Sequence, residues 1–178
     1  MPMPTPMPMI RACRSLLAVL WCLAAPLGAQ ATHAAHTAPA PRASEGGDAA
    51  KVAATLLAVF AAAERNDMKA LDSLYAGDSL TVFEGAGVNR GWTDYRDRHL
   101  APELLEMKNF QYRPADLEIH VDVGTAWVLF RYTLKADVNG RAVDAVGRGT
   151  AILERRGARW VVRHTQTGSR ARRPTDPV

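Results

Sequence analysis

Cysteine is scarce in this sequence, and its position excludes several kinds of site. The 178 residues contain two cysteines, Cys13 and Cys22, and none follows. Beyond residue 22 the sequence therefore offers no disulfide and no thiolate metal centre. Its stability must come from a hydrophobic core, and a chain of this length is long enough for one domain with such a core.

Acidic residues are absent from the first 31 positions, which also lack an apolar run long enough to span a bilayer. Arg11 and Arg14 precede an apolar stretch at 16–25, and Ala29-Gln30-Ala31 has the small-x-small pattern that a signal peptidase cleaves. We predict a cleaved signal peptide over 1–31, and therefore a periplasmic or secreted protein with no stable membrane insertion after cleavage.

A retained N-terminal anchor is the alternative to cleavage, and a lipoprotein would need a small residue where Trp21 precedes Cys22. Cleavage would remove both cysteines and two arginines, so that Lys+Arg would fall from 22 to 20 against 18 Asp+Glu. The net charge would then fall from +4 to +2. So weak a positive charge, without basic residues interleaved with aromatic ones, argues against nucleic acid as a partner.

Both ends of the remaining chain lack a periodic apolar pattern. Residues 32–47 are rich in Ala, Pro, Gly and Ser, which predicts a flexible linker. Its two histidines, His33 and His36, are too few for a closed metal site. Residues 170–178 contain three arginines and two prolines, which predicts a basic, disordered tail.

Three helices are predicted in the first half of the domain. Asp48 is suited to cap the first one. A second, short helix follows at 68–76, and Thr93 is suited to cap a third helix, which Pro102 bends or restarts. One strand, 80–84, lies between the second and third helices and ends at a glycine-rich irregular loop. Apolar residues of the first helix recur at steps of three and four and share one face: Val52, Leu56, Val59, Phe60 and Ala63.

Four strand-like segments follow, joined by tight turns, of which Asn139-Gly140 is the strongest hairpin signal. Pro114 marks a bulge or break in the first segment, and Gly147 with Gly149 marks a bend or bulge in the third. Hairpin-linked strands of this length form a twisted sheet, one face of which the helices can cover. We therefore predict an α+β domain over 48–169, with three N-terminal helices packed on a curved, mostly antiparallel sheet.

Three segments carry a family resemblance: LDSLYAGDSLTVFEGAGVNRG, GTAWVLFRYTL and GTAILERRGARWVVRHTQTGSR. They resemble the SnoaL-like, DUF4440-type branch of the nuclear transport factor 2-like (NTF2-like) superfamily, over roughly residues 49–170. The resemblance implies a cone of helices and curved sheet with a small-molecule pocket at its open end. It implies no single activity, because the superfamily includes isomerases, cyclases, epoxide hydrolases, dehydratases and members without catalysis.

Glu84 ends an apolar strand at the start of a glycine-rich turn, which makes it a candidate for chemistry. Side chains alternate along the last strand, so Trp160, Val162, His164 and Gln166 share a face, and the resemblance places that face inside the cone. Glu84 and His164 would then form a proton-transfer pair in an apolar cleft. The alternative, which the sequence alone favours, is a histidine that is hydrogen-bonded to its neighbours and has no catalytic role.

The catalytic sets of two enzyme branches are incomplete in this chain. The resemblance to ketosteroid isomerases places Glu84 at the position of the general base, but Val59 and residues 150–151 stand where oxyanion donors are required. The epoxide-hydrolase branch requires an Asp–Arg–Asp set, and the candidate inward arginines Arg131 and Arg148 lack a matched pair of aspartates. The sequence therefore leans against an enzyme.

We interpret the chain as an exported protein that binds a small, partly apolar molecule, with Glu84 and His164 at the polar end of its pocket. No metal or other cofactor is predicted, since Gln166 stands where relatives often carry a second histidine, and glutamine is a rare zinc ligand. A proton-transfer enzyme (isomerase, cyclase or hydrolase) and a dimeric interaction module paired through the sheet are the alternatives. The other expected pocket residues are Phe60, Trp92, Tyr95, His99, Trp127, Trp160 and Gln166.

Overall fold

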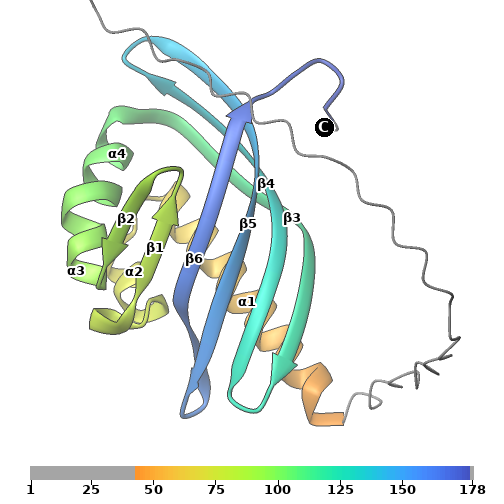
Figure 1. Ribbon diagram of the computed structural model, residues 1–178. Helices are drawn as coiled ribbons and strands as arrows, with labels where there is room; N and C mark the ends of the chain where they lie inside the picture. The colour runs from red at the N-terminus through yellow and green to blue at the C-terminus, as the bar shows by residue number, and fades with distance from the viewer. Residues whose placement is uncertain (1–42, 177–178) are drawn as a thin grey trace, which may run out of the picture. The chain divides into compact units, whose positions relative to one another are not determined.

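A computed structural model describes residues 43–176 of the chain (Figure 1). The predicted signal peptide and most of the predicted linker, with His33 and His36, lie outside the described residues. A 3-10 turn at Gly77–Ser79 precedes the first strand, and a π-helical turn at Arg96–Leu100 joins the third and fourth helices. The elements are, in chain order, α1 (Ala43–Glu64), α2 (Met68–Leu74), β1 (Thr81–Glu84), β2 (Gly87–Arg90), α3 (Trp92–Tyr95), α4 (Ala101–Glu106), β3 (Met107–Asp122), β4 (Thr125–Val138), β5 (Arg141–Arg156) and β6 (Arg159–Ala171).

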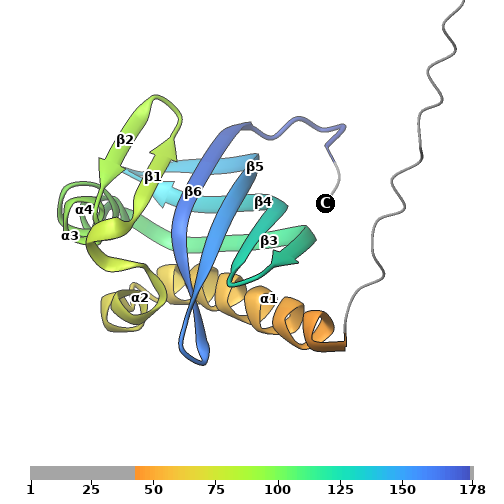
Figure 2. The same ribbon diagram turned by 60° about the horizontal axis from the view of Figure 1, so that its bottom comes forward.

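The strands form one sheet in the order β2-β1-β6-β5-β4-β3. Neighbouring strands are antiparallel except β1 and β6, which are parallel. The four long strands follow one another through hairpins as predicted, whereas β2 forms where the sequence predicts an irregular loop. Figures 1 and 2 show the sheet curving around α1, with the shorter helices gathered near the β1–β2 hairpin. The prediction of helices packed on a curved, mostly antiparallel sheet is confirmed.

Helix α1 lies along the concave face of the sheet and supplies much of the core (Figure 2). It begins at Ala43, before the predicted cap Asp48. Asp48 lies inside the helix, where its carboxylate accepts hydrogen bonds from the side chains of Lys51 and Arg155. The predicted apolar face is confirmed, because all of its residues are buried: Val52, Leu56, Val59, Phe60 and Ala63.

The third predicted helix is interrupted by the π-helical turn. It begins at Trp92, one residue before the predicted cap Thr93. Pro102 has no N–H and therefore cannot donate to the carbonyl four residues earlier. The turn before it is wider than an α-helical turn, because the N–H of Ala101 donates to the carbonyl of Arg96, five residues back. The helix restarts as α4 with the proline in its first turn, as the sequence predicts.

A β-bulge in β6 decides which of its side chains face the core. Leu153 of β5 is opposite Val162, but the preceding residue Ile152 is opposite His164, so Arg163 has no partner across the two strands. An extra residue of this kind shifts the alternation of side chains by one position. Beyond the bulge, the residues that would have faced the core therefore face outward.

The predicted common face of β6 is wrong for this reason. Before the bulge, Trp160 is buried, as predicted. After it, Thr165 is the residue opposite the fully buried Ala151, while His164 and Gln166 lie on the outer face of the sheet. A strict two-residue period in the sequence gives no sign of a bulge, so the sequence alone did not reveal the reversal.

Gly147 and Gly149 of β5 lie beneath two aromatic rings of β4. Of the predicted alternatives, bend or bulge, the bulge is wrong, because the register between these strands continues without a shift. Tyr132 is opposite Gly147 and Phe130 is opposite Gly149, and a Cβ atom at either glycine would overlap the facing ring. The glycines therefore make room for the rings on the inner face of the sheet.

The C-terminal segment is more ordered than the predicted disordered tail at 170–178. Strand β6 extends to residue 171. The guanidinium of Arg170 pairs with the carboxylate of Asp176 through two contacts of 2.6 Å, and Arg172 Nε donates to Asp144 Oδ1 at 2.8 Å. These ion pairs hold the segment against β5 and β6, so the prediction of disorder is wrong as far as residue 176.

We expect Gly149→Ala to destabilise the domain by about 1–3 kcal/mol, because overpacking a filled core has a cost of this order. The new Cβ would lie 2.5 Å from Phe130 Cζ and 2.9 Å from the backbone oxygen of Gln166. Urea unfolding followed by circular dichroism measures the difference.

Gly168→Ala is the matched control, since a Cβ at Gly168 meets no atom within 4 Å. We expect its free energy of unfolding to stay within about 0.5 kcal/mol of the wild-type value. Equal effects of the two substitutions would contradict the role given to the aromatic rings.

Candidate functional site

Glu84 is the last residue of β1 and is placed on the inner face of the sheet. Strand alternation puts it on the same side as Val82, which is buried. Gly85 follows with φ +56°, a conformation that favours glycine, and starts the tight turn into β2. The Glu84 side chain is 42 % exposed, so its carboxylate lies at the rim of the interior and not in its depth.

His99 is the partner of this carboxylate. It comes from the π-helical turn, and its side chain is 18 % exposed. Its Nε2 atom lies 3.6 Å from Glu84 Oε2 and 3.2 Å from Glu103 Oε1. The imidazole thus lies between two carboxylates, one from the end of β1 and one from α4.

Asn89 and Asp94 fix the orientation of the imidazole. The Asn89 side-chain amide donates to Asp94 Oδ2 at 3.0 Å, which turns its carbonyl oxygen toward His99. That oxygen lies 2.8 Å from His99 Nδ1, so Nδ1 carries a proton and donates it. Nε2 therefore faces the carboxylates of Glu84 and Glu103. This arrangement can accept a proton from a neighbouring molecule or deliver one.

The pKa of Glu84 is raised above its usual value. Burial of the carboxylate is the main cause, and the negative charge of Glu103 adds to it, whereas His99 acts in the opposite direction. A larger fraction of Glu84 is therefore protonated at a given pH than of a glutamate in water. A carboxyl group whose pKa is raised in this way is suited to proton transfer or to donating a hydrogen bond.

Three tyrosines project into the same interior: Tyr75, Tyr95 and Tyr112. Among the described residues, none of their hydroxyls hydrogen-bonds a protein atom, and no enclosed side-chain polar atom lacks a partner. Each hydroxyl is therefore accessible to at least a water molecule. Burial raises the pKa of all three phenols, and the charge of Glu84 raises it further.

Three of the predicted pocket residues belong to the hydrophobic core. Phe60 packs on Tyr112 with ring centres 4.3 Å apart, and Trp160 lies beneath the guanidinium of Arg155 at 5.2 Å. Trp92 is stacked on Tyr75, the residue that follows α2, and is 6 % exposed. These positions make Phe60, Trp92 and Trp160 structural residues around the site.

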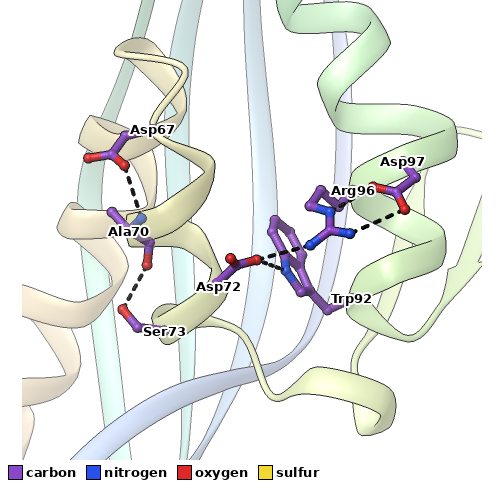
Figure 3. Close-up of polar contacts among 7 residues, drawn as sticks. All are labelled: Asp67, Ala70, Asp72, Ser73, Trp92, Arg96 and Asp97. Carbon is purple, nitrogen blue, oxygen red and sulfur yellow. Dashed lines mark hydrogen bonds and ion pairs between the residues drawn. The ribbon is translucent and has the colours of Figure 1, made fainter.

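Trp92 also connects α2 with α3 (Figure 3). Its indole N–H donates to the carboxylate of Asp72, which also accepts from Arg96 Nη1 at 3.3 Å. Arg96 in turn donates to both oxygens of Asp97. This network holds the start of α3 against α2 and so supports the helical segment that carries Tyr95 and His99.

Three other predicted site residues face away from the interior. His164 accepts or donates a hydrogen bond of 2.7 Å with Thr81 Oγ1 on the outer face, and burial lowers its pKa. Trp127 is 42 % exposed and stacked on His120 of β3 on the outer face. Gln166 is exposed. The predicted pairing of His164 with Glu84 is wrong, because the bulge in β6 turns His164 outward.

The sequence missed Asn89, Glu103, Tyr75 and Tyr112 as members of the site. Glu103 had a local signal, because residues four apart on a helix are neighbours and His99 is four residues earlier. The two tyrosines had none, since Tyr75 follows α2 and Tyr112 lies in β3, and they meet only in the folded chain. Within residues 43–176, no group of three or more His, Cys, Asp and Glu side chains is arranged to hold a metal ion, and no helix is both long and apolar enough to cross a membrane.

Helices packed on a curved sheet, with titratable groups at one end of the interior, define a cone of the NTF2-like class. The chain belongs to the family described as SnoaL-like domain, whose model matches residues 52–169. No curated protein sequence matches the chain significantly.

Solved structures of the same fold include a candidate dehydratase of the NTF2-like family from Streptomyces avermitilis. It is 19 % identical to this chain with a TM-score of 0.63, and the match covers 69 % of this chain and 96 % of that chain. A candidate ketosteroid isomerase from Shewanella frigidimarina is 18 % identical, with a TM-score of 0.58. The match covers 64 % of this chain and 91 % of that chain. An NTF2-like superfamily protein from Salmonella enterica is 14 % identical, with a TM-score of 0.65. The match covers 74 % of this chain and 95 % of that chain. At these identities the likeness shows the fold and no activity.

The titration of Glu84 tests the geometry of the site. We expect Glu103→Gln to lower the pKa of Glu84, because it removes a negative charge that favours the protonated form, and His99→Gln to raise it. Carboxyl-carbon NMR spectra of labelled protein, recorded against pH, measure both shifts. Shifts in the same direction would contradict the placement of His99 between the two carboxylates.

The same pKa has a consequence for stability. The pKa of Glu84 is higher in the folded protein than in the unfolded chain, where it is near 4.5. The side chain therefore stabilises the fold below pH 4.5, and this contribution is lost as the pH rises through the pKa of the folded protein. The free energy of unfolding of Glu84→Gln, taken relative to the wild type, should therefore be higher at pH 7 than at pH 4. The difference should be less than about 1 kcal/mol, because the side chain is partly exposed. Urea unfolding at the two pH values measures it, and a relative loss at pH 7 would contradict the raised pKa.

Proposed function

We propose that the protein binds a small, partly apolar molecule in the interior of the cone, with Glu84 and His99 at the polar end of the site. The observation that carries the proposal is the set of phenol hydroxyls of Tyr75, Tyr95 and Tyr112, which have no protein partner among the described residues. Buried polar groups are nearly always hydrogen-bonded, so these hydroxyls require water or a ligand.

The lining suggests the chemistry of the ligand. Partly buried apolar side chains, including Met107, Phe110 and Leu134, pack around the core on the same inner side. A mostly apolar wall with a few convergent polar groups suits a hydrophobic ligand that bears one or two oxygen atoms. The phenols would donate hydrogen bonds to such an oxygen, as would Glu84 in its protonated form.

Native mass spectrometry of the protein, purified without extensive dialysis, tests this proposal. We expect a reproducible small-molecule adduct in the wild type and at least a tenfold lower occupancy in Glu84→Gln and Tyr95→Phe, since each loses a hydrogen-bonding group of the site, roughly 1–3 kcal/mol. The measured mass also reports whether residues 1–31 have been cleaved, and thus tests the proposed export.

His164→Ala is the control, because His164 lies on the opposite face of the sheet and should leave the adduct unchanged. Loss of the adduct in His164→Ala alone would contradict the inner site. Absence of any adduct, together with no response to added apolar ligands, would count against the ligand-binding function.

A second candidate function is proton-transfer catalysis at the same site. The observation that favours it is the position of His99 Nε2 between the carboxylates of Glu84 and Glu103, together with the raised pKa of Glu84. A positioned acid–base group with a shifted pKa is what such catalysis requires. The likeness in fold to a candidate dehydratase and a candidate ketosteroid isomerase agrees with this class of chemistry.

Isotope exchange distinguishes catalysis from binding. If Glu84 removes a carbon-bound proton, a recovered ligand incubated with protein in D₂O should gain deuterium, and Glu84→Gln should slow the exchange at least a hundredfold. The mass of the ligand measures the exchange. A ligand that binds but never exchanges would favour the binding function.

Self-association through the outer face of the sheet is part of the proposal. Trp127 and Ile152 are 42 % and 36 % exposed, and they lie opposite each other on β4 and β5. Exposed apolar patches of this kind favour association. Ile152→Glu should shift the protein toward the monomer in sedimentation velocity, whereas Leu105→Glu on α4, where the side chain is 76 % exposed, should not. A wild-type protein that stays monomeric would contradict the dimer.

A further inference from the structure

We propose a second binding site, for the carboxylate of a small organic acid, on the outer face of the sheet around Arg148. It is separate from the interior site, because the sheet lies between them. An open groove of about 1250 Å³ crosses the outer face here, lined by residues of β3, β4, β5 and β6 and by Asp176. The following features of the groove support this proposal.

Strand register places Arg148 at the centre of the groove floor. Arg148 is opposite Arg131 of β4 on one side and Gly168 of β6 on the other. Both neighbouring glycines in β5 face inward beneath aromatic rings, so Arg148 faces outward. The sequence predicted Arg131 and Arg148 as inward arginines, which the register contradicts.

Of the three arginines that line the groove, Arg148 alone has no ion pair within residues 43–176. Arg131 pairs with Asp116 at 2.8 Å, from the irregular part of β3 that follows Pro114, and Arg170 pairs with Asp176 at 2.6 Å. Arg148 has no partner among the described residues. Arg131 and Arg148 lie directly opposite each other, and like charges in such a pair repel. An anion bound at Arg148 would reduce this repulsion.

Gly168 leaves space beside the guanidinium of Arg148. A Cβ atom at Gly168 would meet no other atom within 4 Å, whereas one at Gly149 would meet the ring of Phe130. The planar fork of an arginine binds a carboxylate through two parallel hydrogen bonds, and the open space next to it admits such a group.

The surroundings favour a singly charged ligand with an apolar body. Glu118, whose carboxylate pairs with no arginine of the described chain, lines the wall and would repel a doubly charged phosphate more strongly than a singly charged carboxylate. Next to Arg148 on the outer face, three residues lie side by side on neighbouring strands: Leu129 of β4, Thr150 of β5 and Gln166 of β6. Leu129 is 40 % exposed. The apolar body would lie on Leu129, and the hydroxyl and amide would serve polar substituents.

Thermal unfolding with sodium benzoate as the probe, at constant ionic strength, tests this site. We expect tens of millimolar benzoate to raise the melting temperature of the wild type by a few degrees, because a ligand that binds only the folded state stabilises it. The increase should vanish in Arg148→Gln. It should persist in Arg141→Gln, which removes an exposed arginine of the same strand outside the groove.

Two further variants make the test specific. Gly168→Glu supplies a carboxylate from the chain itself, so it should raise the melting temperature without benzoate and abolish the response to benzoate. Benzoate also fits the description of the interior ligand, so the comparison is repeated in Tyr95→Phe, which weakens the interior site: the response should persist in Tyr95→Phe and vanish when Arg148→Gln is added to it. The interior function can therefore fail without affecting this result, and the reverse also holds.

Three results would overturn the proposal. The first is a benzoate response of undiminished size in the double variant Tyr95→Phe/Arg148→Gln while this variant is folded, as judged by circular dichroism. The second is a response to phosphate that exceeds the response to benzoate. The third is a loss of self-association in Arg148→Gln by sedimentation velocity, which would assign Arg148 to a contact with a second copy of the chain.

Discussion

The packing of α1 into the hollow of the sheet is the constraint on which the rest of the structure depends. Leu56 and Val52 of this helix are 1 % and 0 % exposed, and Phe60 contacts aromatic rings from both β3 and β4. A sheet can surround a helix only if its long strands curve, and bulky inner side chains need room where they do so. Gly147 and Gly149 provide that room, since the rings of β4 lie directly over them.

The wall that surrounds α1 also separates two environments. On its inner side, Glu84 meets His99 and lies near phenols that have no protein partner among residues 43–176. On its outer side, ion pairs and exposed apolar residues face solvent, and Arg148 has no ion-pair partner among the same residues. Strand alternation determines the side to which each residue belongs, so a single bulge at Arg163 changes which residues can take part in the interior site.

Much of the fold could be predicted from local patterns. The apolar spacing of α1 and the hairpin turn at Asn139-Gly140 depend on residues close in sequence, and both are confirmed. The position of Glu84 at the end of β1 was predictable for the same reason. Its partner was not, because His99 reaches it only through a π-helical turn and the packing of α3 against α2, which no short sequence pattern encodes. His164 was assigned to the wrong face because an extra residue in a strand leaves no compositional signal.

The central claim is that the interior beside Glu84 is an occupied or solvated site and not a filled core. A crystal structure at high resolution tests it most directly. The account predicts electron density for water or a ligand within hydrogen-bond distance of the hydroxyls of Tyr75, Tyr95 and Tyr112, close to the carboxylate of Glu84. Hydroxyls that are hydrogen-bonded to protein atoms, with no density between them, would contradict it.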